Sequence, residues 1–575
     1  MNTDENYEQL ARLGFIEKEY VSKCISMSQP EIDPKAPYRP VHTGLFELYY
    51  QNKVTKRKYC VYVPQTMLPP GAGIFVFSDS RNEPRNVVND REIIELSEKL
   101  GVSIIYLFAP NGWNNSDFSE DLSYANAALA DALSTSIYNI GMFYGRQYVF
   151  GMGDGCQTAF IFARLHSQRI SAIALNTEVD IDEDILSTID LYYKKLPVNV
   201  YGGNRPQSAW IVKKAEKNNI FNYLFSVDKC NNSISSVDRQ YYFNDNGAFE
   251  TAAGRRSDAS VIVSSETPTI KNQFEFLVQF RTVYEDGGYI RKRVSFDDLR
   301  LKKFEETIND RKREWYLYLP PHSNYEKLPL VVALHGYTGT GEYFAETSEW
   351  TNVAARRGFA VLFPCSYPYA RKENGSCYCP LPAWNCGIYP RDDNLDDVDF
   401  IKQVIEKTCT EFNIDKHRIY ATGHSNGSRM TQKLMREYPI FAAYGPVGAT
   451  ETDSEGKPFA IPFENQTLPV WYIMSEFDVG HAARLDEKSD TYKTLDYMYR
   501  YMGILDGLTV VTNNYPFVTI KKYNKYKEPL VIFSKMLDMP HAYTPEISHL
   551  LWDEFFSCWS TDEDGNAVYV NGAFR

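Results

Sequence analysis

The sequence predicts an α/β fold made of two related domains, each built on a mostly parallel sheet. Short apolar segments alternate along the chain with longer amphipathic segments, as strands and helices do in such folds. Short motifs of the first half also return in the second half in the same order. The 575 residues, 43% of them hydrophobic, suffice for about two to four domains with cores of their own.

Three pairs of motifs define the repeat. The segment KRKYCVYVP at 56–64 resembles KREWYLYLP at 312–320, and GMGDG at 151–155 resembles GHSNG at 423–427. LPV occurs at both 196–198 and 468–470. Because the order is kept at a nearly constant offset, the two halves are interpreted as homologous.

These matches predict the organisation of the chain. We expect an N-terminal extension over residues 1–44, a first domain over 45–290 and a second over 300–575. The charged stretch Arg291–Arg313 is expected to connect the two domains.

The second half predicts its elements most clearly. Leu328–Leu334 is a continuous apolar run before His335-Gly336, as expected of a buried parallel strand. Ser348 is a plausible N-cap and Gly358 a plausible C-cap for the helix that follows. Further strands are expected at 359–364, 418–423, 468–474 and 530–533, and further helices at 396–412, 428–438 and 545–556.

GHSNG at 423–427 fits the pattern G-x-S-x-G between an apolar strand and a helix. This context is typical of a sharp turn that exposes a nucleophilic serine, here Ser425, above a sheet. A serine hydroxyl needs a base within reach and an acid that orients the base. In this fold the acid follows a later strand and the histidine follows the last strand.

Asp478 and His541 occupy those two places, and we predict the triad Ser425, Asp478 and His541. Glu476 is the main rival for the acid. The other histidines of this half are interpreted as packing, loop or surface residues, namely His335, His424, His481 and His549.

The backbone amides of Asn426 and Tyr337 are expected to form the oxyanion hole. Asn426 directly follows the nucleophile, and Tyr337 follows Gly336 at the end of the first parallel strand of this half. His424 adjoins Ser425, so it is also a candidate for the wall of the substrate pocket.

The motifs of the second half resemble the polyhydroxybutyrate depolymerase and feruloyl esterase group of α/β-hydrolases. The resemblance covers about residues 310–560 and is carried by LHGYT at 334–338, GFAVLFP at 358–364, DDVDFI at 396–401 and GHSNGSRM at 423–430. It implies serine-dependent hydrolysis of carboxylic esters by the same triad. It also implies that Trp384 lines the acyl pocket, although Ala383 and Cys386 replace a Cys and a Trp of the family segment.

The first half keeps the pattern of the second without its chemistry. Gly153 stands where Ser425 stands, and the position matched to Asp478 falls near Arg205-Pro206. No histidine occurs between His166 and His322. We therefore expect two tandem α/β-hydrolase-type domains, the first catalytically degenerate. Asp154 is a poor candidate for a substitute nucleophile, because it lies one residue out of register with Ser425 and lacks a base. Four roles stay open for this domain: packing against the active half, shaping its cleft, binding a carbohydrate part of the substrate, or forming a homo-oligomer.

Neither a metal nor a cofactor is expected. Cys365, Cys377, Cys379 and Cys386 cluster in one segment, but their spacing lacks the paired cysteines of common zinc sites. Free thiols are the leading interpretation there, with a disulfide and a zinc site as alternatives. No glycine-rich loop has a phosphate-binding context.

Charge and composition restrict the expected partners. The net charge of −13 opposes binding to nucleic acid or to anionic membrane surfaces, and no apolar run is long enough for a membrane span. The polar, acidic N-terminus does not resemble a secretory signal, so a cytoplasmic location is expected unless a leader has been removed.

The leading hypothesis is a serine esterase that forms an acyl-enzyme. Its expected substrates are hydroxycinnamoyl or other small soluble esters, including esters on oligosaccharides. The alternatives are a serine peptidase of the prolyl-oligopeptidase type, a depolymerase of a hydroxyalkanoate polyester, and a binding protein with both halves inert. The repeat counts against the peptidase, whose N-terminal domain is a β-propeller.

Overall fold

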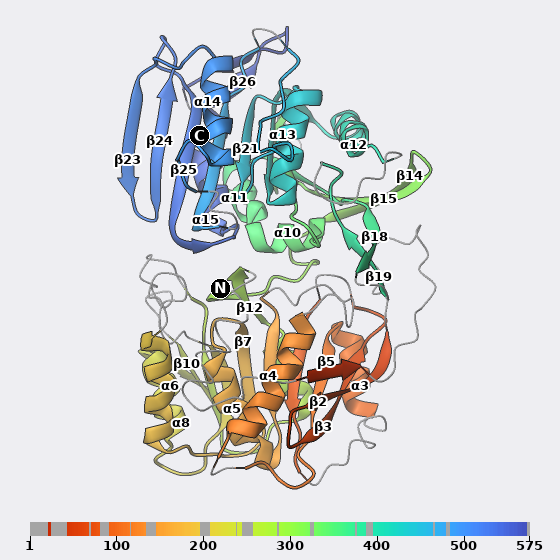
Figure 1. The fold of residues 1–575 in the computed structure, drawn as a ribbon, viewed down its shortest axis with the longest axis vertical. Coiled ribbons are helices and arrows are strands. Elements are labelled where there is room, and N and C mark those ends of the chain that lie inside the picture. Colours follow the sequence, from red (N-terminus) through yellow and green to blue (C-terminus); the bar gives the residue numbers. More distant parts are fainter. Residues whose placement is uncertain are drawn as a thin grey trace. The chain divides into compact units, whose positions relative to one another are not determined.

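The computed structural model shows two compact units, the first mostly before residue 294 and the second mostly after it (Figure 1). Each unit is considered by itself below. The structure describes residues 21–24, 43–67, 71–80, 91–114, 117–133, 145–195, 207–236, 238–243, 257–284, 287–321, 327–373, 377–386, 395–463, 466–478 and 483–571.

The first unit is built on an 11-stranded sheet whose middle strands, from β5 to β11, run parallel. The order across this sheet is β1 (Val21–Cys24), β2 (Gly44–Gln51), β3 (Lys56–Val63), β5 (Ser103–Leu107), β4 (Gly73–Phe77), β6 (Gln147–Gly151), β7 (Ile170–Leu175), β8 (Ser208–Val212), β11 (Val261–Ser264), β10 (Arg239–Phe243) and β9 (Asn232–Ser235).

The 10-stranded sheet of the second unit repeats this order without a counterpart of β1, and its strands from β17 to β25 run parallel. The order is β14 (Lys302–Ile308), β15 (Arg311–Tyr318), β17 (Ala360–Pro364), β16 (Leu328–Leu334), β20 (Ile414–His424), β21 (Ala443–Val447), β22 (Val470–Phe477), β25 (Pro529–Pro540), β24 (Phe517–Tyr523) and β23 (Thr509–Asn514). The predicted α/β class is therefore confirmed.

Helices pack on both faces of each sheet (Figure 1). In the first unit, α4 (Ser119–Leu133), α5 (Cys156–Leu165), α6 (Glu183–Lys195) and α8 (Asn219–Val227) lie on one face, and α3 (Arg91–Leu100) and α9 (Ile270–Leu277) on the other. In the second, α12 (Asp397–Glu411) contacts α13 (Asn426–Glu437), α14 (Asp490–Tyr501) contacts β25, and α15 (Pro545–Glu554) contacts α10 (Gly341–Ser348) and α11 (Trp350–Arg357).

Alternation along the strands gives the first unit a core on each face of its sheet. Phe75 and Phe77 of β4 pack with α4 and α5, whereas Ile74 and Val76 pack with α3 and α9. The continuous apolar strands are thus explained by burial on both faces.

Three short antiparallel strand pairs lie outside the two large sheets. They are β12 (Phe280–Tyr284) with β13 (Gly287–Lys292), β18 (Pro368–Glu373) with β19 (Cys377–Pro382), and β26 (Trp559–Thr561) with β27 (Ala567–Tyr569).

Two expectations about boundaries were wrong. The helix predicted from Ser348 begins at Trp350, because Glu349 is left-handed, with φ 54°, and separates α10 from α11; Gly358 ends α11 as predicted, with φ 75°. The stretch Arg291–Arg313 is not wholly a connection, since it contains the end of β13, the whole of β14 and the start of β15.

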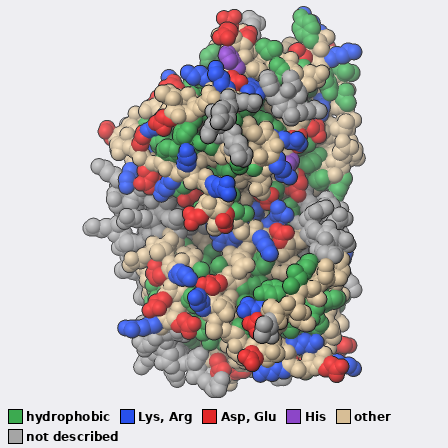
Figure 2. Space-filling view, turned by 180° about the vertical axis from the view of Figure 1, so that it is seen from behind, with side chains coloured by type: hydrophobic (Ala, Val, Ile, Leu, Met, Phe, Trp, Pro, Cys, Tyr) green, Lys and Arg blue, Asp and Glu red, His purple; other side chains and the backbone are tan. Residues whose placement is uncertain are grey.

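The surface is mixed in charge, with acidic and basic side chains interspersed over the face drawn in Figure 2. Within the described part of the chain, no helix combines the length and the apolar character that crossing a bilayer requires.

Candidate active site

Ser425 sits on a strained turn between β20 and α13. Its φ of 55° and ψ of −111° are unfavourable for a residue with a side chain, and its amide donates to Val447 O at 2.8 Å. The flanking glycines make the turn possible, because a Cβ built on Gly423 would lie 2.4 Å from Gly427 O and one on Gly427 would lie 2.2 Å from Leu334 O. The predicted strand-to-helix turn is therefore present.

Asp478 and His541 meet at the carboxyl ends of two neighbouring parallel strands, β22 and β25. His541 Nδ1 and Asp478 Oδ1 lie 2.5 Å apart, with the aspartate side chain 1% exposed and the histidine side chain 21% exposed. Glu476, the rival acid, instead faces Lys535, with Oε1 and Nζ 3.7 Å apart. The acid beside His541 is therefore Asp478.

His541 also lies close to the nucleophile turn. A Cβ built on Gly448 would be 3.1 Å from His541 Cε1, and Gly448 follows the Val447 whose carbonyl accepts the Ser425 amide. The structure thus brings all three predicted triad residues to one edge of the sheet.

His424 packs against His541, with ring centroids 4.7 Å apart and planes at 30°. Burial, together with the nearby His541, lowers the pKa of His424 well below its usual value. A neutral His424 presents no like charge to His541 when that ring accepts a proton. Contact of His424 with substrate stays a prediction.

The loop after β16 passes directly beside Ser425. A Cβ built on Gly336 would lie 3.5 Å from Ser425 Cβ. Tyr337 is the next residue along the loop, so it also lies near Ser425. Asn426 begins α13, where the first amides have no acceptor within the helix. Both predicted oxyanion positions therefore flank the serine.

His335 holds this loop in place. Its Nε2 accepts from the Ser366 amide at 3.0 Å, so the proton lies on Nδ1, which donates to Gly336 O at 2.7 Å. Burial lowers the pKa of His335 to about 4, which keeps the ring neutral. The loop role expected for His335 accounts for these contacts.

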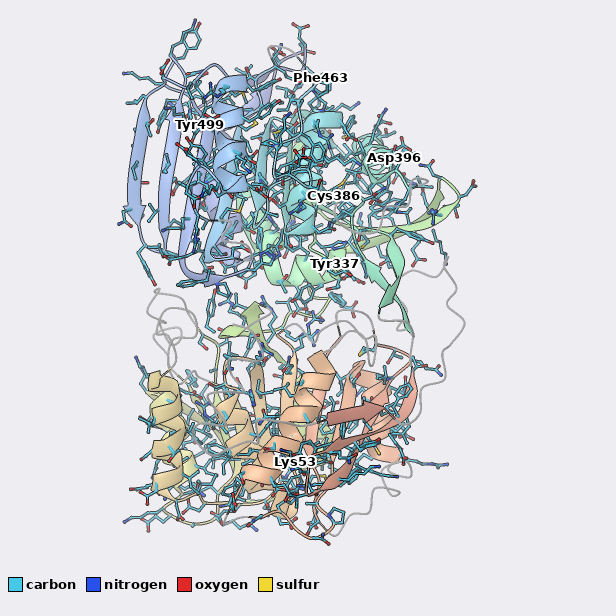
Figure 3. All side chains as sticks on the ribbon, viewed as in Figure 1. Lys53, Tyr337, Cys386, Asp396, Phe463 and Tyr499 are labelled. Atoms are coloured by element: carbon cyan, nitrogen blue, oxygen red, sulfur yellow. The ribbon has the colours of Figure 1, made fainter. Side chains whose placement is uncertain are left out.

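Trp384 joins the two segments that are predicted to form the oxyanion hole. Its side chain is fully buried, its indole nitrogen donates to His335 O at 2.8 Å, and its amide donates to Asn426 Oδ1 at 2.6 Å. The side-chain nitrogen of Asn426, Nδ2, in turn donates to Cys386 Sγ at 3.0 Å. Figure 3 labels Tyr337, Cys386 and Asp396 in this part of the second unit. These contacts are with protein, and the pocket-lining role expected of Trp384 stays a prediction.

A buried ion pair behind Trp384 was not predicted. Arg313 and Asp397 are 2% and 0% exposed, with Nη2 and Oδ1 2.7 Å apart, and Asp397 Oδ2 accepts from the Asn385 amide at 2.7 Å. The Arg313 guanidinium also lies 3.6 Å from the ring centroid of Phe400. The sequence did contain a signal for this ion pair, because Arg313 belongs to the first repeated motif and matches Arg57.

The corresponding turn of the first unit has nearly the same φ at its central residue but no room for a nucleophile. Gly153 has φ 54°, yet a Cβ built there would lie 2.0 Å from Asp79 Oδ2. Phe77 pairs with Gly151 as Leu334 pairs with Gly423, so Asp79 occupies the place of Gly336.

Asp154 is held by a different contact, because its Oδ1 accepts from the Ser80 amide at 2.8 Å.

The match of the third motif was wrong in register. LPV at 196–198 and Arg205-Pro206 lie outside the described residues, and the strand at this place in the sheet is β8. A buried tryptophan fixes the register, since Trp210 donates to Ser264 Oγ as Trp471 donates to Ser534 Oγ. In this register Lys217, which is no acid, matches Asp478.

The cysteine cluster is only partly described. Cys365 and Cys386 are buried, whereas the side chains of Cys377 and Cys379 lie outside the described residues, as does His481. Among the side chains that are described, no three His, Cys, Asp or Glu residues are grouped to hold a metal.

Comparison with known proteins bears on the second unit. Residues 314–452 match the family model described as Esterase PHB depolymerase. The predicted family resemblance is confirmed. The matched segment contains Ser425, Asn426 and Tyr337 and ends before Asp478 and His541.

Curated relatives of this esterase segment include acetylxylan esterase A of Aspergillus ficuum, 30% identical over 133 residues, which are 23% of this chain and 40% of that protein. Acetylxylan esterase A of Talaromyces purpureogenus is 30% identical over 141 residues, 23% of this chain and 34% of that protein. The chain thus spans less than half the length of these relatives. Among solved structures, the acetyl xylan esterase from Aspergillus awamori is 17% identical with a TM-score of 0.34, over 44% of this chain and 98% of its own.

Proposed function

We propose that the second unit is a serine carboxylic-ester hydrolase. The observation that carries the proposal is the 2.5 Å contact between His541 Nδ1 and Asp478 Oδ1 beside the strained turn at Ser425. Asp478 fixes the His541 tautomer that leaves Nε2 as the base for the serine hydroxyl. The esterase segment of the sequence supports the same chemistry.

The reaction then runs in two balanced steps. Ser425 Oγ attacks the ester carbonyl carbon, its proton passes to His541 Nε2, and the alcohol leaves with that proton to give an acyl-enzyme. Water next attacks the acyl carbon and gives a proton to His541, which returns it to Ser425 as the acid departs. The Asn426 and Tyr337 amides stabilise the oxyanion in both steps, each by about 3–4 kcal/mol.

A small acyl group on an oligosaccharide is the favoured substrate. The curated relatives are named acetylxylan esterases, which favours an acetyl ester over the hydroxycinnamoyl ester expected from sequence. The first unit is proposed to be non-catalytic, because Asp79 occupies the place where a serine side chain at position 153 would project.

Hydrolysis of a substrate panel tests this function. The panel holds an acetylated xylo-oligosaccharide, methyl ferulate, a hydroxybutyrate oligomer and a proline-containing peptide amide. We expect acetyl release by the wild type and a loss of roughly 10⁴-fold or more in kcat for Ser425→Ala. Asp154→Asn and Glu476→Gln are the matched controls and should keep the activity. Turnover that survives Ser425→Ala would refute the triad, and turnover of the peptide alone would replace the esterase with a peptidase.

A further inference from the structure

The two units share a buried framework of arginine, aspartate and tryptophan. In the first unit Arg57 Nη1 lies 2.5 Å from Asp121 Oδ1, Asp121 Oδ2 accepts from the Asn114 amide at 2.8 Å, and Trp113 Nε1 donates to Ser78 O at 2.8 Å. These contacts match those that Arg313, Asp397 and Trp384 make in the second unit, one for one.

The side chains of the framework are more exposed in the first unit than in the second. The Arg57 and Asp121 side chains are 13% and 5% exposed, against 2% and 0% for their counterparts. Residues 108–118 connect β5 to α4, whereas the much longer segment 365–396 connects β17 to α12.

A cavity of about 750 Å³ lies over this framework. It is lined by Thr55, Lys56, Arg57, Lys58, Phe108, Ala109, Pro110, Asn111, Gly112, Trp113, Asn114, Glu120 and Asp121. The volume falls within the range of about 300–1,000 Å³ usual for small-molecule sites. Because residues 108–114 follow β5, the cavity lies at the carboxyl end of a parallel strand, where ligands bind in open α/β sheets.

Most charges of this cavity are already paired within the protein. Arg57 is paired with Asp121 and also donates to Phe108 O at 2.9 Å, and Lys58 Nζ lies 3.3 Å from Glu47 Oε2. Lys56 lies on the Tyr49 ring, 4.0 Å from its centroid. The lining therefore offers both hydrogen-bond donors and hydrogen-bond acceptors. Because most of its charges are paired, it has no strong electrostatic preference for an anion or a cation.

We propose that this cavity is an oligosaccharide-binding site of the first unit. Neutral hydroxyl groups, each both donor and acceptor, match a lining of amides, ammonium groups, carboxylates and backbone carbonyls. Pro110, which is exposed, adds apolar surface for the ring carbons. The site lies in the first unit and does not include Ser425, so it goes beyond the proposed hydrolysis.

Calorimetric titration of Ser425→Ala with xylopentaose tests the site without turnover. We expect saturable binding that Asn111→Trp, which fills the cavity, abolishes and that Lys56→Ala weakens by about tenfold, as loss of one or two hydrogen bonds would. Lys312→Ala is the matched control, because Lys312 is the counterpart of Lys56 in the second unit and should leave affinity unchanged.

The possible outcomes separate this proposal from the proposed function. Binding that is insensitive to Asn111→Trp and Lys56→Ala would overturn the site, as would absence of binding of xylopentaose and of its glucuronic-acid-substituted form by the folded protein. Neither result bears on ester hydrolysis by Ser425. Binding of the substituted form alone would keep an oligosaccharide site and assign its carboxylate to Lys56.

Discussion

His335 shows how a buried histidine can hold the loop that is predicted to form part of the oxyanion hole. Its two ring nitrogens are committed to Ser366 N and Gly336 O, which fixes both its tautomer and the path of the loop. Protonation would break the bond that Nε2 accepts, and burial opposes the charge as well.

His335 should therefore make the second unit sensitive to acid. Its folded pKa of about 4 lies below the unfolded value of about 6.5, so the folded state binds fewer protons between these values. The contribution to the free energy of unfolding is complete above about pH 6.5 and is lost as the pH falls to about 4, by up to about 3 kcal/mol.

Urea unfolding of wild type and His335→Gln across this pH range measures the effect. The variant should lose stability less steeply on acidification, while His417→Gln, at a histidine whose side chain is 42% exposed, should follow the wild type. Parallel curves for wild type and His335→Gln would contradict the assignment.

At the scale of elements, the segment around Trp384 links β16, α12 and α13. Arg313 of β15 binds Asp397 at the start of α12, and Asp397 holds the Asn385 amide next to Trp384. Trp384 then bonds both His335 O and Asn426 Oδ1. The position of the loop after β16 thus depends on a salt bridge that does not involve Ser425.

Asp397→Ala should lower stability and activity together. Removing one partner of a buried pair costs about 3–5 kcal/mol, and the loosened loop should reduce kcat more than it changes KM. Asp121→Ala removes the matching contact of the first unit and should destabilise that unit while leaving kcat for a small ester intact. Chemical unfolding with steady-state kinetics checks this, and an unchanged kcat in Asp397→Ala would refute the link.

The two units share one strand order, but the corresponding turns at Gly153 and Ser425 have different surroundings. Gly153 and Ser425 have φ values of 54° and 55°, so the turn is a property of the repeated fold. Asp79 fills the first copy of the site, and Gly336 leaves the second copy open.

Restoring the serine should not restore catalysis in the first unit. Gly153→Ser in a Ser425→Ala background should stay inactive and lose stability, because the new Cβ overlaps the Asp79 carboxylate. Adding Asp79→Gly should recover stability without activity, since Lys217 stands in place of the acid. Ester hydrolysis and thermal unfolding of the three variants check this, and regained turnover in Gly153→Ser would contradict a degenerate first unit.

Local patterns were sufficient for much of the fold. The strand Leu328–Leu334 was predicted with its exact bounds because it is apolar throughout and ends at a glycine turn. The break between α10 and α11 was missed, since no local signal marks Glu349 as left-handed. The LPV match was misleading because a short motif cannot specify which strand pairs with β7.

Periodicity and chain order are enough to predict the α/β class, the repeat, the turn at Ser425 and the order in which Asp478 and His541 follow it. Three features could not be predicted in this way: Asp478 rather than Glu476 bonds His541, Asp79 fills the first site, and the Arg57 framework lies under an open cavity. These outcomes depend on strand register and loop packing, which bring together side chains that are far apart in the chain.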